Sequence, residues 1–402
     1  MKRRQQFVVF LLVLLVVSQA PFLYRRYRFG LLQKSIDGLL AERVPPAPED
    51  NYLDYRGVIH IHSRLGGHST GEPSDIVTAA RANDLAYVVM TEHSPRDSYA
   101  ASAALRGVHA GIVFIDGSEV SVKDGIRLLV IPGVPGHPWP SLSAQEAIWK
   151  AKSQGKLAFI AYPEGRPLAE IDGYDGIEVY NAHTQTKRIS RSRLFFDILW
   201  SYRPYAHLLA TRLYLRPVDN LRAWDELNAG GRQLTAIGGI DAHANIGIAL
   251  RTHASQTLAG VLVDPYALTF RIVRNYILLE KGRPFDAQSL LDAMAGGQTY
   301  VGFDLLADAS GFRFTAENGT EKRIMGQKIA LAGGVRFAAV SPQSARIVLL
   351  RNGQVEQEGV KAKRQEFTVH RQGAYRVEVY LDRLEEPLAA HPWIISNSIY
   401  VR

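Results

Sequence analysis

From residue 56 to about residue 300, short apolar runs alternate with stretches of helical spacing. The runs at 57–62 and 86–90 have the length of strands, and the segment 74–83 between them has the spacing of an amphipathic helix. Further strands are predicted at 112–115, 127–131, 157–161, 176–180 and 234–240, and further helices at 143–154 and within 187–229. Strands that alternate with helices in this way predict a parallel α/β architecture of the barrel type.

The pattern changes near residue 300, after a predicted helix at 287–295. Apolar and polar residues now alternate with period two, and Gly-rich or polar turns separate the runs. The predicted strands are 312–314, 335–340, 346–350, 366–369, 375–380 and 398–401. Such half-buried strands pair in antiparallel sheets, so the pattern predicts a small β-sandwich over residues 301–402.

The N-terminal segment is an apolar stretch between two basic clusters. Residues 7–17 are uninterrupted apolar, and aromatic residues extend the stretch after a short polar interruption. A cleaved signal peptide would end at a small residue such as Ala20, but Pro21 would then follow the cut. An uncleaved transmembrane helix fits the length and the flanking aromatic and basic residues better. We therefore expect a membrane anchor over residues 1–28.

The side of the membrane on which the body lies follows less directly. Three basic residues precede the apolar stretch and three follow it, so the positive-inside rule is nearly balanced. We expect the body outside the cytoplasm, with a body on the cytoplasmic face or a protein secreted after signal cleavage as alternatives. Residues 29–50 end in a Pro-rich run and are expected to form a stiff linker.

The net charge of +8 is concentrated at the N-terminus. Residues 1–28 hold six of the 47 basic residues and none of the 39 acidic ones, which leaves +2 for the rest of the chain. A nearly neutral body lacks the basic face of a nucleic-acid-binding protein, so no nucleic-acid partner is expected. The chain has no cysteine, which excludes thiolate metal sites, iron–sulfur clusters and cysteine nucleophiles.

Four of the twelve histidines fall near the ends of the first two predicted strands. His60 and His62 end the strand 57–62, where alternation places both imidazoles on one face of the sheet. His68 follows in a Gly-rich loop, and His93 lies just past the second strand. Two imidazoles on one face at a strand end are typical of a pair of metal ligands.

Further ligand types follow later strands: Glu119 comes after 112–115, and Asp241 and His243 come after 234–240. The carboxyl ends of the strands of an α/β barrel converge on one face, where active sites are built. Imidazole and carboxylate together suit Zn²⁺, Mn²⁺ or Fe²⁺. The sequence therefore predicts a site for divalent metal ions at these strand ends.

In order, spacing and context, these motifs resemble the PHP (polymerase and histidinol phosphatase) metallohydrolase superfamily. The resemblance covers roughly residues 56–300. The segments that carry it are 58–63, 88–93, 117–119, 176–181 and 239–243. It implies a distorted (β/α)₇ TIM-like barrel over residues 51–300, with two or three divalent metal ions at the carboxyl ends of its strands.

The resemblance also implies which residues hold the metal ions. One ion would be held by His60, His62, Glu119 and Asp241, and another by His68, His93 and His243, with Glu119 bridging to a middle ion. The predicted sandwich, whose last segment includes 392–397, is similar to the tail of exported PHP-type metallohydrolases.

Three positions depart from the family pattern. Glu92 stands where the family usually has Asp, Tyr162 stands where it has a ligating His before Pro, and Arg127 replaces a further ligand. The last two changes would affect the middle ion most. Either the site holds fewer ions, or Tyr162, Glu164 or His183 fills the place, or catalysis is impaired.

The activity expected from this resemblance is hydrolysis of a phosphate ester. A hydroxide bridging the metal ions would attack phosphorus in line, Asp241 would orient it, and Arg127 or Arg166 would hold the substrate phosphate. The substrate is expected to be a small molecule or a polymer-linked ester. A metal-dependent amide, carbamate or ester hydrolase and a catalytically degenerate, membrane-tethered binding protein are the alternatives.

Overall fold

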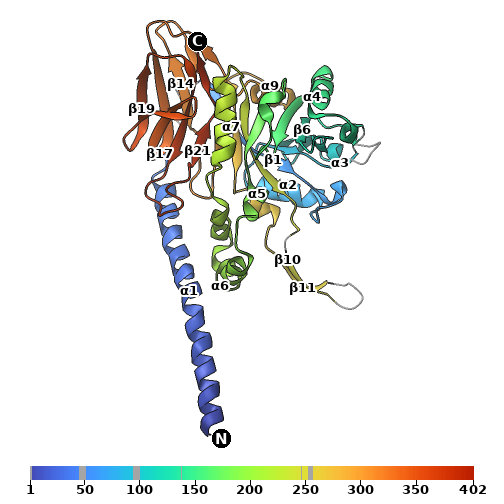
Figure 1. The fold of residues 1–402 in the computed structure, drawn as a ribbon, viewed down its shortest axis with the longest axis vertical. Coiled ribbons are helices and arrows are strands. Elements are labelled where there is room, and N and C mark those ends of the chain that lie inside the picture. Colours follow the sequence, from blue (N-terminus) through green and yellow to red (C-terminus); the bar gives the residue numbers. More distant parts are fainter. Residues whose placement is uncertain (1, 45–50, 94–99, 137, 246, 252–256) are drawn as a thin grey trace.

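The computed structural model describes residues 2–44, 51–93, 100–136, 138–245, 247–251 and 257–402. The chain forms a mixed α/β fold with a large sheet, from which one long helix projects (Figure 1). The strands of the large sheet that carry the predicted site are β1 (Tyr52–Ile61), β2 (Tyr87–Met90), β4 (Ile112–Ile115), β5 (Ser118–Ser121), β6 (Arg127–Ile131), β7 (Leu157–Ala161), β8 (Gly176–Asn181) and β9 (Thr235–Ala242).

These strands pair in the order β4, β2, β1, β9, β8, β7, β6, β5. The pairs from β4 to β7 in this order are parallel, as the sequence pattern predicts. Strand β6 is the exception, because it runs antiparallel to both β5 and β7. Only residues 122–126 join β5 to β6, and so short a connection permits a hairpin but no parallel crossover.

Helices connect the parallel strands and cover the sheet. They are α2 (Pro73–Ala82), α3 (Ala100–Ala103), α4 (Ala144–Ser153), α5 (Ala182–Thr186), α6 (Arg191–Leu209), α7 (Val218–Ala229), α8 (Tyr266–Thr269) and α9 (Ala287–Ala295). Adjacent residues of a strand, such as Val58 and Ile59, enter two different apolar clusters. Both faces of the sheet are therefore buried, which is the usual environment of parallel strands.

The strands after β9 are mostly antiparallel. They are β10 (Gly247–Arg251), β11 (Thr257–Leu262), β12 (Arg274–Glu280), β13 (Thr299–Gly302), β14 (Arg313–Glu317), β15 (Lys322–Ile324), β16 (Lys328–Ile329), β17 (Val335–Arg351), β18 (Gln354–Glu358), β19 (Ala362–Val369), β20 (Gly373–Tyr380), β21 (Ile394–Ser396) and β22 (Ile399–Val401). The two strands predicted at 335–340 and 346–350 are one continuous strand, β17. Its first half pairs with β14 and β19, and its second half with β18 and β20.

The C-terminal strands are joined to the strands of the site. Strand β1 pairs with β12, β12 with β13, and β13 with β21, so hydrogen bonding continues from one set of strands to the other. The buried Asn397 accepts a hydrogen bond from the N–H of Ala236 in β9 and donates one to its carbonyl. Arg376 of β20 forms a buried bidentate ion pair with Asp225 of α7, at 2.7 Å. That residues 301–402 form a separate sandwich domain stays a prediction.

The long helix α1 (Lys2–Ala41) has two different halves. Its first half is long and apolar enough to cross a membrane, and the apolar side chains of residues 7–17 are exposed. Its second half is part of the body, because Phe29, Ile36 and Leu39 are buried there. Residues 29–41 therefore continue the helix where a linker was expected, and the Pro-rich part of that segment, 45–50, lies outside the described residues.

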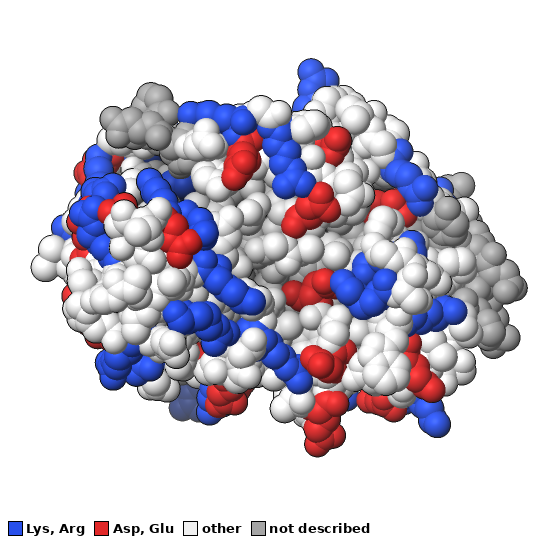
Figure 2. Space-filling view, turned by 90° about the horizontal axis from the view of Figure 1, so that it is seen from above, with Lys and Arg blue, Asp and Glu red and all other residues white. Residues whose placement is uncertain are grey.

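The site end of the sheet and the projecting half of α1 lie on the same side of the body. Helices α5 and α6 follow the carboxyl end of β8, and the β10–β11 hairpin follows that of β9; all three lie on the side towards which α1 extends (Figure 1). The opposite face, seen from above in Figure 2, carries lysine and arginine side chains mixed with aspartate and glutamate.

We predict that replacing Leu39 by Ala destabilises the body, because its side chain is only 1% exposed. A buried Leu→Ala substitution usually costs about 2–5 kcal/mol of unfolding free energy. The neighbouring Leu40 is 46% exposed, so Leu40→Ala should change stability by less than about 0.5 kcal/mol. Thermal unfolding of the detergent-solubilised chain measures both variants. Equal melting temperatures would mean that the second half of α1 does not pack on the body.

Candidate metal centre

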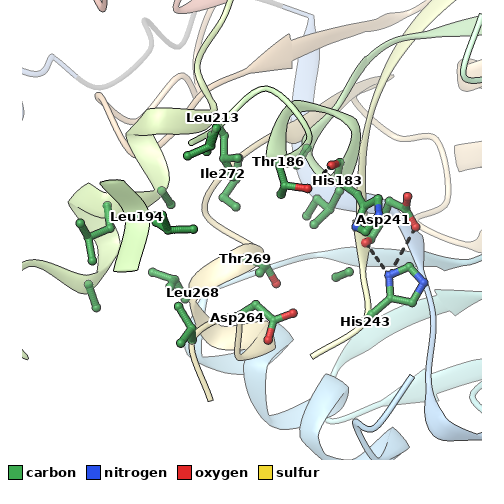
Figure 3. Close-up of a pocket in the computed structure, with 18 of the residues that line it drawn as sticks. His183, Thr186, Leu194, Leu213, Asp241, His243, Asp264, Leu268, Thr269 and Ile272 are labelled. Carbon is green, nitrogen blue, oxygen red and sulfur yellow. Dashed lines mark hydrogen bonds and ion pairs between the residues drawn. The ribbon is translucent and has the colours of Figure 1, made fainter. Parts of the chain in front are cut away.

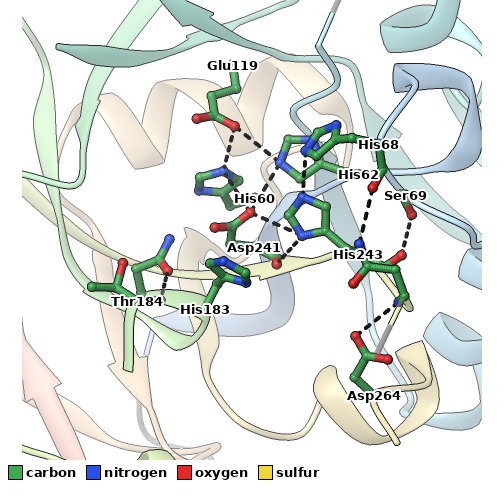
Figure 4. A network of polar contacts seen from close by, with 12 residues as sticks. His60, His62, His68, Ser69, Glu119, His183, Thr184, Asp241, His243 and Asp264 are labelled. Atoms are coloured by element: carbon green, nitrogen blue, oxygen red, sulfur yellow. Dashed lines mark hydrogen bonds and ion pairs between the residues drawn. The ribbon is translucent and has the colours of Figure 1, made fainter. Parts of the chain in front are cut away.

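Four buried ligand groups converge where the strands of the site end. His60 lies in β1 and His62 directly follows that strand, while Glu119 comes from β5 and Asp241 from β9 (Figure 4). One ligand atom of each residue lies within 4.8 Å of the corresponding atoms of the other three. All four side chains are at most 4% exposed, so water does not solvate their charges. The sequence prediction placed these residues together, and the structure brings them together.

The spacing of these atoms suits a small divalent cation. The Nε2 atom of His60 lies 3.3 Å from Oε2 of Glu119 and 3.5 Å from Oδ1 of Asp241. The Nε2 atom of His62 lies 3.4 Å from both of these oxygens. Four ligands at about 2.0–2.1 Å from one ion in a tetrahedral arrangement stand about 3.3–3.4 Å apart. The donor set therefore has the chemistry and the spacing of a metal site.

The hydrogen bonding of the cluster gives a second test of the fit. Among the described residues, neither ring nitrogen of His62 has a hydrogen-bond partner, and neither does Oδ1 of Asp241. Buried polar atoms are normally paired, because an unpaired one costs about 1–3 kcal/mol. A cation bound among these atoms would satisfy them, so the residues present fit a bound metal ion.

His60 is held in place by a group that the sequence analysis did not assign. Its Nδ1 atom lies 2.7 Å from Oε1 of the fully buried Glu178, whose Oε2 accepts a hydrogen bond from Asn181 Nδ2 at 3.0 Å. A carboxylate on the second nitrogen of a ligating imidazole fixes its tautomer and raises its basicity. Glycine is required at position 239, because a Cβ atom there would lie 1.5 Å from Glu178 Oε1.

Each carboxylate of the cluster has one oxygen among the histidines and the other held by a side chain beside the cluster. Oε2 of Glu119 faces the histidines, and its Oε1 accepts a hydrogen bond from Arg127 NH1 at 3.0 Å. Oδ1 of Asp241 faces the cluster, and its Oδ2 accepts a hydrogen bond from the Tyr162 hydroxyl at 2.5 Å. Two of the three departures from the family pattern therefore contact the carboxylates directly. Arg127 and Tyr162 bind the outer oxygens, Oε1 of Glu119 and Oδ2 of Asp241. The inner oxygens, Oε2 of Glu119 and Oδ1 of Asp241, point at the histidines.

Electrostatic contacts keep both carboxylates ionised. Although burial opposes ionisation, the hydrogen bond from His60 and the close imidazole of His62 hold the pKa of Glu119 well below its ordinary value. Burial likewise opposes ionisation of Asp241, but the same two histidines hold the pKa of Asp241 well below its ordinary value. Two adjacent carboxylates in an apolar shell attract a cation strongly, because little water screens them.

A second group of histidines adjoins the first. His62, His68 and His243 form another set of ligand atoms within 4.8 Å of one another. His243 Nε2 lies 2.7 Å from His68 Nε2, and His93 Nε2 lies 3.2 Å from Glu119 Oε2. Burial lowers the pKa of His93 and of His243 to about 4, so both rings are neutral and able to bind a metal near neutral pH. All seven predicted ligands lie at this site, and the number of ions they hold stays a prediction.

Left-handed backbone conformations position three of the side chains. His60, Tyr162 and Asp241 have φ angles of 70°, 49° and 54°. Such conformations cost a non-glycine residue on the order of 1–3 kcal/mol and are concentrated at functional sites. At His60 the register between β1 and its two neighbours shifts, so the two imidazoles do not meet through simple strand alternation as we expected. The bulge turns His60 towards the cluster instead.

Glu92, the third departure, does not face the metal cluster. It is fully buried, and its Oε1 accepts hydrogen bonds from the N–H of Ser63, at 2.8 Å, and from the Ser63 hydroxyl. Burial raises the pKa of Glu92 to about 7. The residue therefore fixes the loop that follows His62 and acts on the site through that loop.

A polar cavity of about 1170 Å³ opens onto the centre. Arg127, Arg166 and Lys187 line it, together with His183 and the ligand residues already described. The sequence analysis named both arginines for phosphate binding but missed Lys187, because a lysine after a short helix carries no motif. Three cationic side chains around one cavity favour an anionic substrate.

His183 and Glu164, the two other residues considered as replacements for the missing histidine ligand, lie in different places. His183 lines the cavity, and its ring centre is 5.6 Å from that of His243. Glu164 does not reach the cluster, because its Oε1 accepts a hydrogen bond from Asn220 Nδ2 at 2.9 Å. Of the alternatives, Tyr162 is the one that contacts a predicted ligand.

Comparisons with known proteins give only distant likenesses. No family model matches the sequence, and no curated protein matches it. A two-domain protein of Bacteroides vulgatus, containing a predicted PHP-like metal-dependent phosphoesterase, is 15% identical and has a TM-score of 0.42 over 89% of this chain and 98% of that chain. PsfC of Pseudomonas syringae is 13% identical, with a TM-score of 0.35 over 62% and 91% of the two chains.

A third solved structure, a protein of Bifidobacterium adolescentis predicted to be a metal-dependent phosphoesterase, is 15% identical. Its TM-score is 0.28, over 46% of this chain and 87% of that chain. All three TM-scores lie below 0.5. The function proposed for this chain therefore rests on its own residues.

We predict that Glu178→Gln weakens metal binding by about 10–100-fold, because His60 loses the carboxylate that orients it. Isothermal titration of metal-free protein with Zn²⁺ or Mn²⁺ measures the affinity, and thermal unfolding checks that the variant folds. Glu164→Gln makes the same change beside the cavity, at a residue bound to Asn220, and should leave the affinity unaltered. Equal affinities for the two variants would remove Glu178 from the support of the site.

Proposed function

We propose that this protein is a metal-dependent phosphoesterase anchored in a membrane by α1. The observation that carries the proposal is the convergence of four buried ligand groups beside a cavity lined by three cations. Neutral imidazoles and ionised carboxylates are the ligand types that Zn²⁺, Mn²⁺ and Fe²⁺ prefer. The cations around the cavity match a substrate whose reacting group is negatively charged.

His60, His62, Glu119 and Asp241 would hold one ion, and His68, His93 and His243 would complete the centre. When bound, divalent ions withdraw charge from a phosphoryl oxygen and make water a better nucleophile at neutral pH. The outer oxygens of Glu119 and Asp241 are held by Arg127 and Tyr162, which supports a centre of two ions in preference to three.

The remaining residues are assigned to orientation and substrate binding. Tyr162 donates its hydroxyl hydrogen to Asp241 and so fixes the plane of that carboxylate, which would orient the attacking water. Arg127 is 41% exposed towards the cavity, and Arg166 and Lys187 also line it. These three cations would bind the phosphate oxygens by charge-assisted hydrogen bonds.

The cationic lining is also what favours a phosphate ester over an amide, carbamate or carboxylic ester. A neutral carbonyl substrate gains nothing from three positive charges, whereas a phosphate dianion needs them when it leaves water. The assay described below tests the third alternative, a binding protein without catalytic activity.

For the fold and the location we propose the finer statements that the sequence suggested. The strand pairings, together with an isolated parallel bridge between Glu92 and Ser118, support a closed barrel. The barrel has seven strands when β4 and β5, which only residues 116–117 separate, are counted as one. Helix α1 continues through Ala20 and Pro21 and then packs on the body, which supports an uncleaved anchor. The lack of cysteine is compatible with a body outside the cytoplasm.

We predict that the detergent-solubilised full chain, loaded with Mn²⁺ or Zn²⁺, hydrolyses p-nitrophenyl phosphate, and that a chelator abolishes the activity. Asp241→Asn should lower turnover by at least about 100-fold, because it removes a ligand charge from the centre. Asp172→Asn is the matched control, since Asp172 is 84% exposed and should leave turnover unchanged.

Parallel assays on bis-p-nitrophenyl phosphate and p-nitrophenyl acetate separate the alternatives. Faster cleavage of the acetate than of either phosphate ester would favour a carboxylic ester hydrolase. A metal-loaded, folded chain that cleaves none of these compounds would support the binding protein and contradict the proposed enzyme.

A further inference from the structure

A second cavity, of about 910 Å³, meets the polar cavity at the metal centre. The walls of the two cavities share His183, Asp241 and His243, and these residues lie together at one side of the second cavity in Figure 3. Apart from this shared end, the second cavity is mostly apolar. In Figure 3, Leu194 and Leu268 lie on the side of the cavity away from Asp241 and His243.

The walls of this apolar cavity come from elements that follow the carboxyl ends of β8 and β9. Leu194 and Ile198 belong to α6, Leu268 to α8, and Leu213 and Ile272 to neighbouring turns. Asp264 is a charged exception, and its Oδ2 accepts a hydrogen bond from the N–H of Asn245. Such a lining removes apolar surface from water but offers few hydrogen bonds to a sugar or a nucleoside.

Helix α6 also contacts the part of α1 that adjoins its apolar stretch. The Phe196 ring stacks on Phe22, with centroids 4.4 Å apart, and Trp200 Nε1 donates a hydrogen bond to Gln19 at 2.9 Å. On its outer surface α6 exposes Phe195 and Leu199. The helix that forms a wall of the apolar cavity therefore stands where a membrane-spanning α1 would leave the bilayer.

The residues around this junction have the composition of a membrane interface. Tyr24 and Tyr27 of α1 are more than half exposed, and the Arg25 guanidinium lies 4.5 Å from the centre of the Phe22 ring. Aromatic and basic side chains gather at the level of lipid headgroups. The residues of α5 and α6 that line the apolar cavity belong to helices on this side of the body (Figure 1).

We propose that the substrate is a lipid phosphate monoester, with its phosphate in the polar cavity and its apolar chain in the apolar cavity. This inference rests on the proposed phosphoesterase function and specifies its substrate class. The three cations of the polar cavity suit a phosphate dianion, and the apolar walls suit a hydrocarbon chain that enters from the adjacent bilayer.

The reaction is a hydrolysis that balances without a further reactant. Water supplies the oxygen that bonds to phosphorus, and the bond between phosphorus and the lipid oxygen breaks. One hydrogen of the water ends on the lipid oxygen, so the products are a lipid alcohol and inorganic phosphate. The alcohol stays in the bilayer and the phosphate leaves through the polar cavity, which opens to solvent.

The test uses the metal-loaded full chain reconstituted in phosphatidylcholine vesicles that contain phosphatidic acid. We expect kcat/KM for phosphatidic acid to exceed that for glycerol 3-phosphate by at least about tenfold, because only the first compound fills the apolar cavity. Leu194→Trp, which fills part of the cavity, should lower kcat/KM for phosphatidic acid about tenfold or more. The ratio of kcat/KM for phosphatidic acid to kcat/KM for p-nitrophenyl phosphate should therefore fall.

Leu199→Trp makes the same change on an outward-facing part of α6, where the leucine is 65% exposed, and should alter neither activity. Binding of a fluorescent phosphatidic acid to metal-free protein gives a second readout. Leu194→Trp should weaken it about tenfold, and Leu199→Trp should not.

The outcomes distinguish the two proposals. Equal cleavage of glycerol 3-phosphate and phosphatidic acid by the unaltered chain would overturn the lipid inference and leave the phosphoesterase intact. Binding of the fluorescent lipid that Leu194→Trp does not weaken would also overturn it. A chain that binds the lipid through the apolar cavity but cleaves no phosphate ester would contradict the proposed function and support the lipid site.

Discussion

The constraint on which the structure depends is the burial of two carboxylates and several imidazoles in one apolar shell. Glu119 and Asp241 keep their negative charges away from water, which is strongly unfavourable unless positive groups face them. The imidazoles of His60 and His62 face them on the inner side, and Arg127 and Tyr162 donate hydrogen bonds on the outer side. A divalent cation bound among the inner atoms would complete this balance.

Holding that site requires packing well beyond its ligands. Glu178 orients His60 and reaches it only because position 239 is glycine, and Glu92 fixes the loop after His62. The C-terminal part of the chain contributes as well, since Asn397 binds the backbone of β9, the strand that leads to Asp241. A substitution at any of these positions would move a metal ligand. Residues that hold metal ligands in place usually matter nearly as much for metal binding as the ligands themselves.

The position of α1 gives the site a fixed relation to the membrane that we propose. Because Phe29, Ile36 and Leu39 pack into the body, the apolar half of α1 is not joined through a loose tether. The carboxyl ends of the site strands lie on the side to which that half extends (Figure 1). An active site that faces a bilayer, with an apolar cavity beside a cationic one, can take a substrate that never fully enters water.

The sequence by itself determined the strands 86–90, 112–115 and 157–161, the helix 287–295 and the set of groups that meet, because strand ends and faces follow from local periodicity. It did not determine the role of Glu178 or of Tyr162. Their partners, His60 and Asp241, are far away in the sequence, and no local pattern indicates these contacts. The left-handed turn at His60 and the meeting of the two cavities were decided by the tertiary structure. Each depends on long-range contacts that compensate for strain or exclude water, and periodicity carries no information about those contacts.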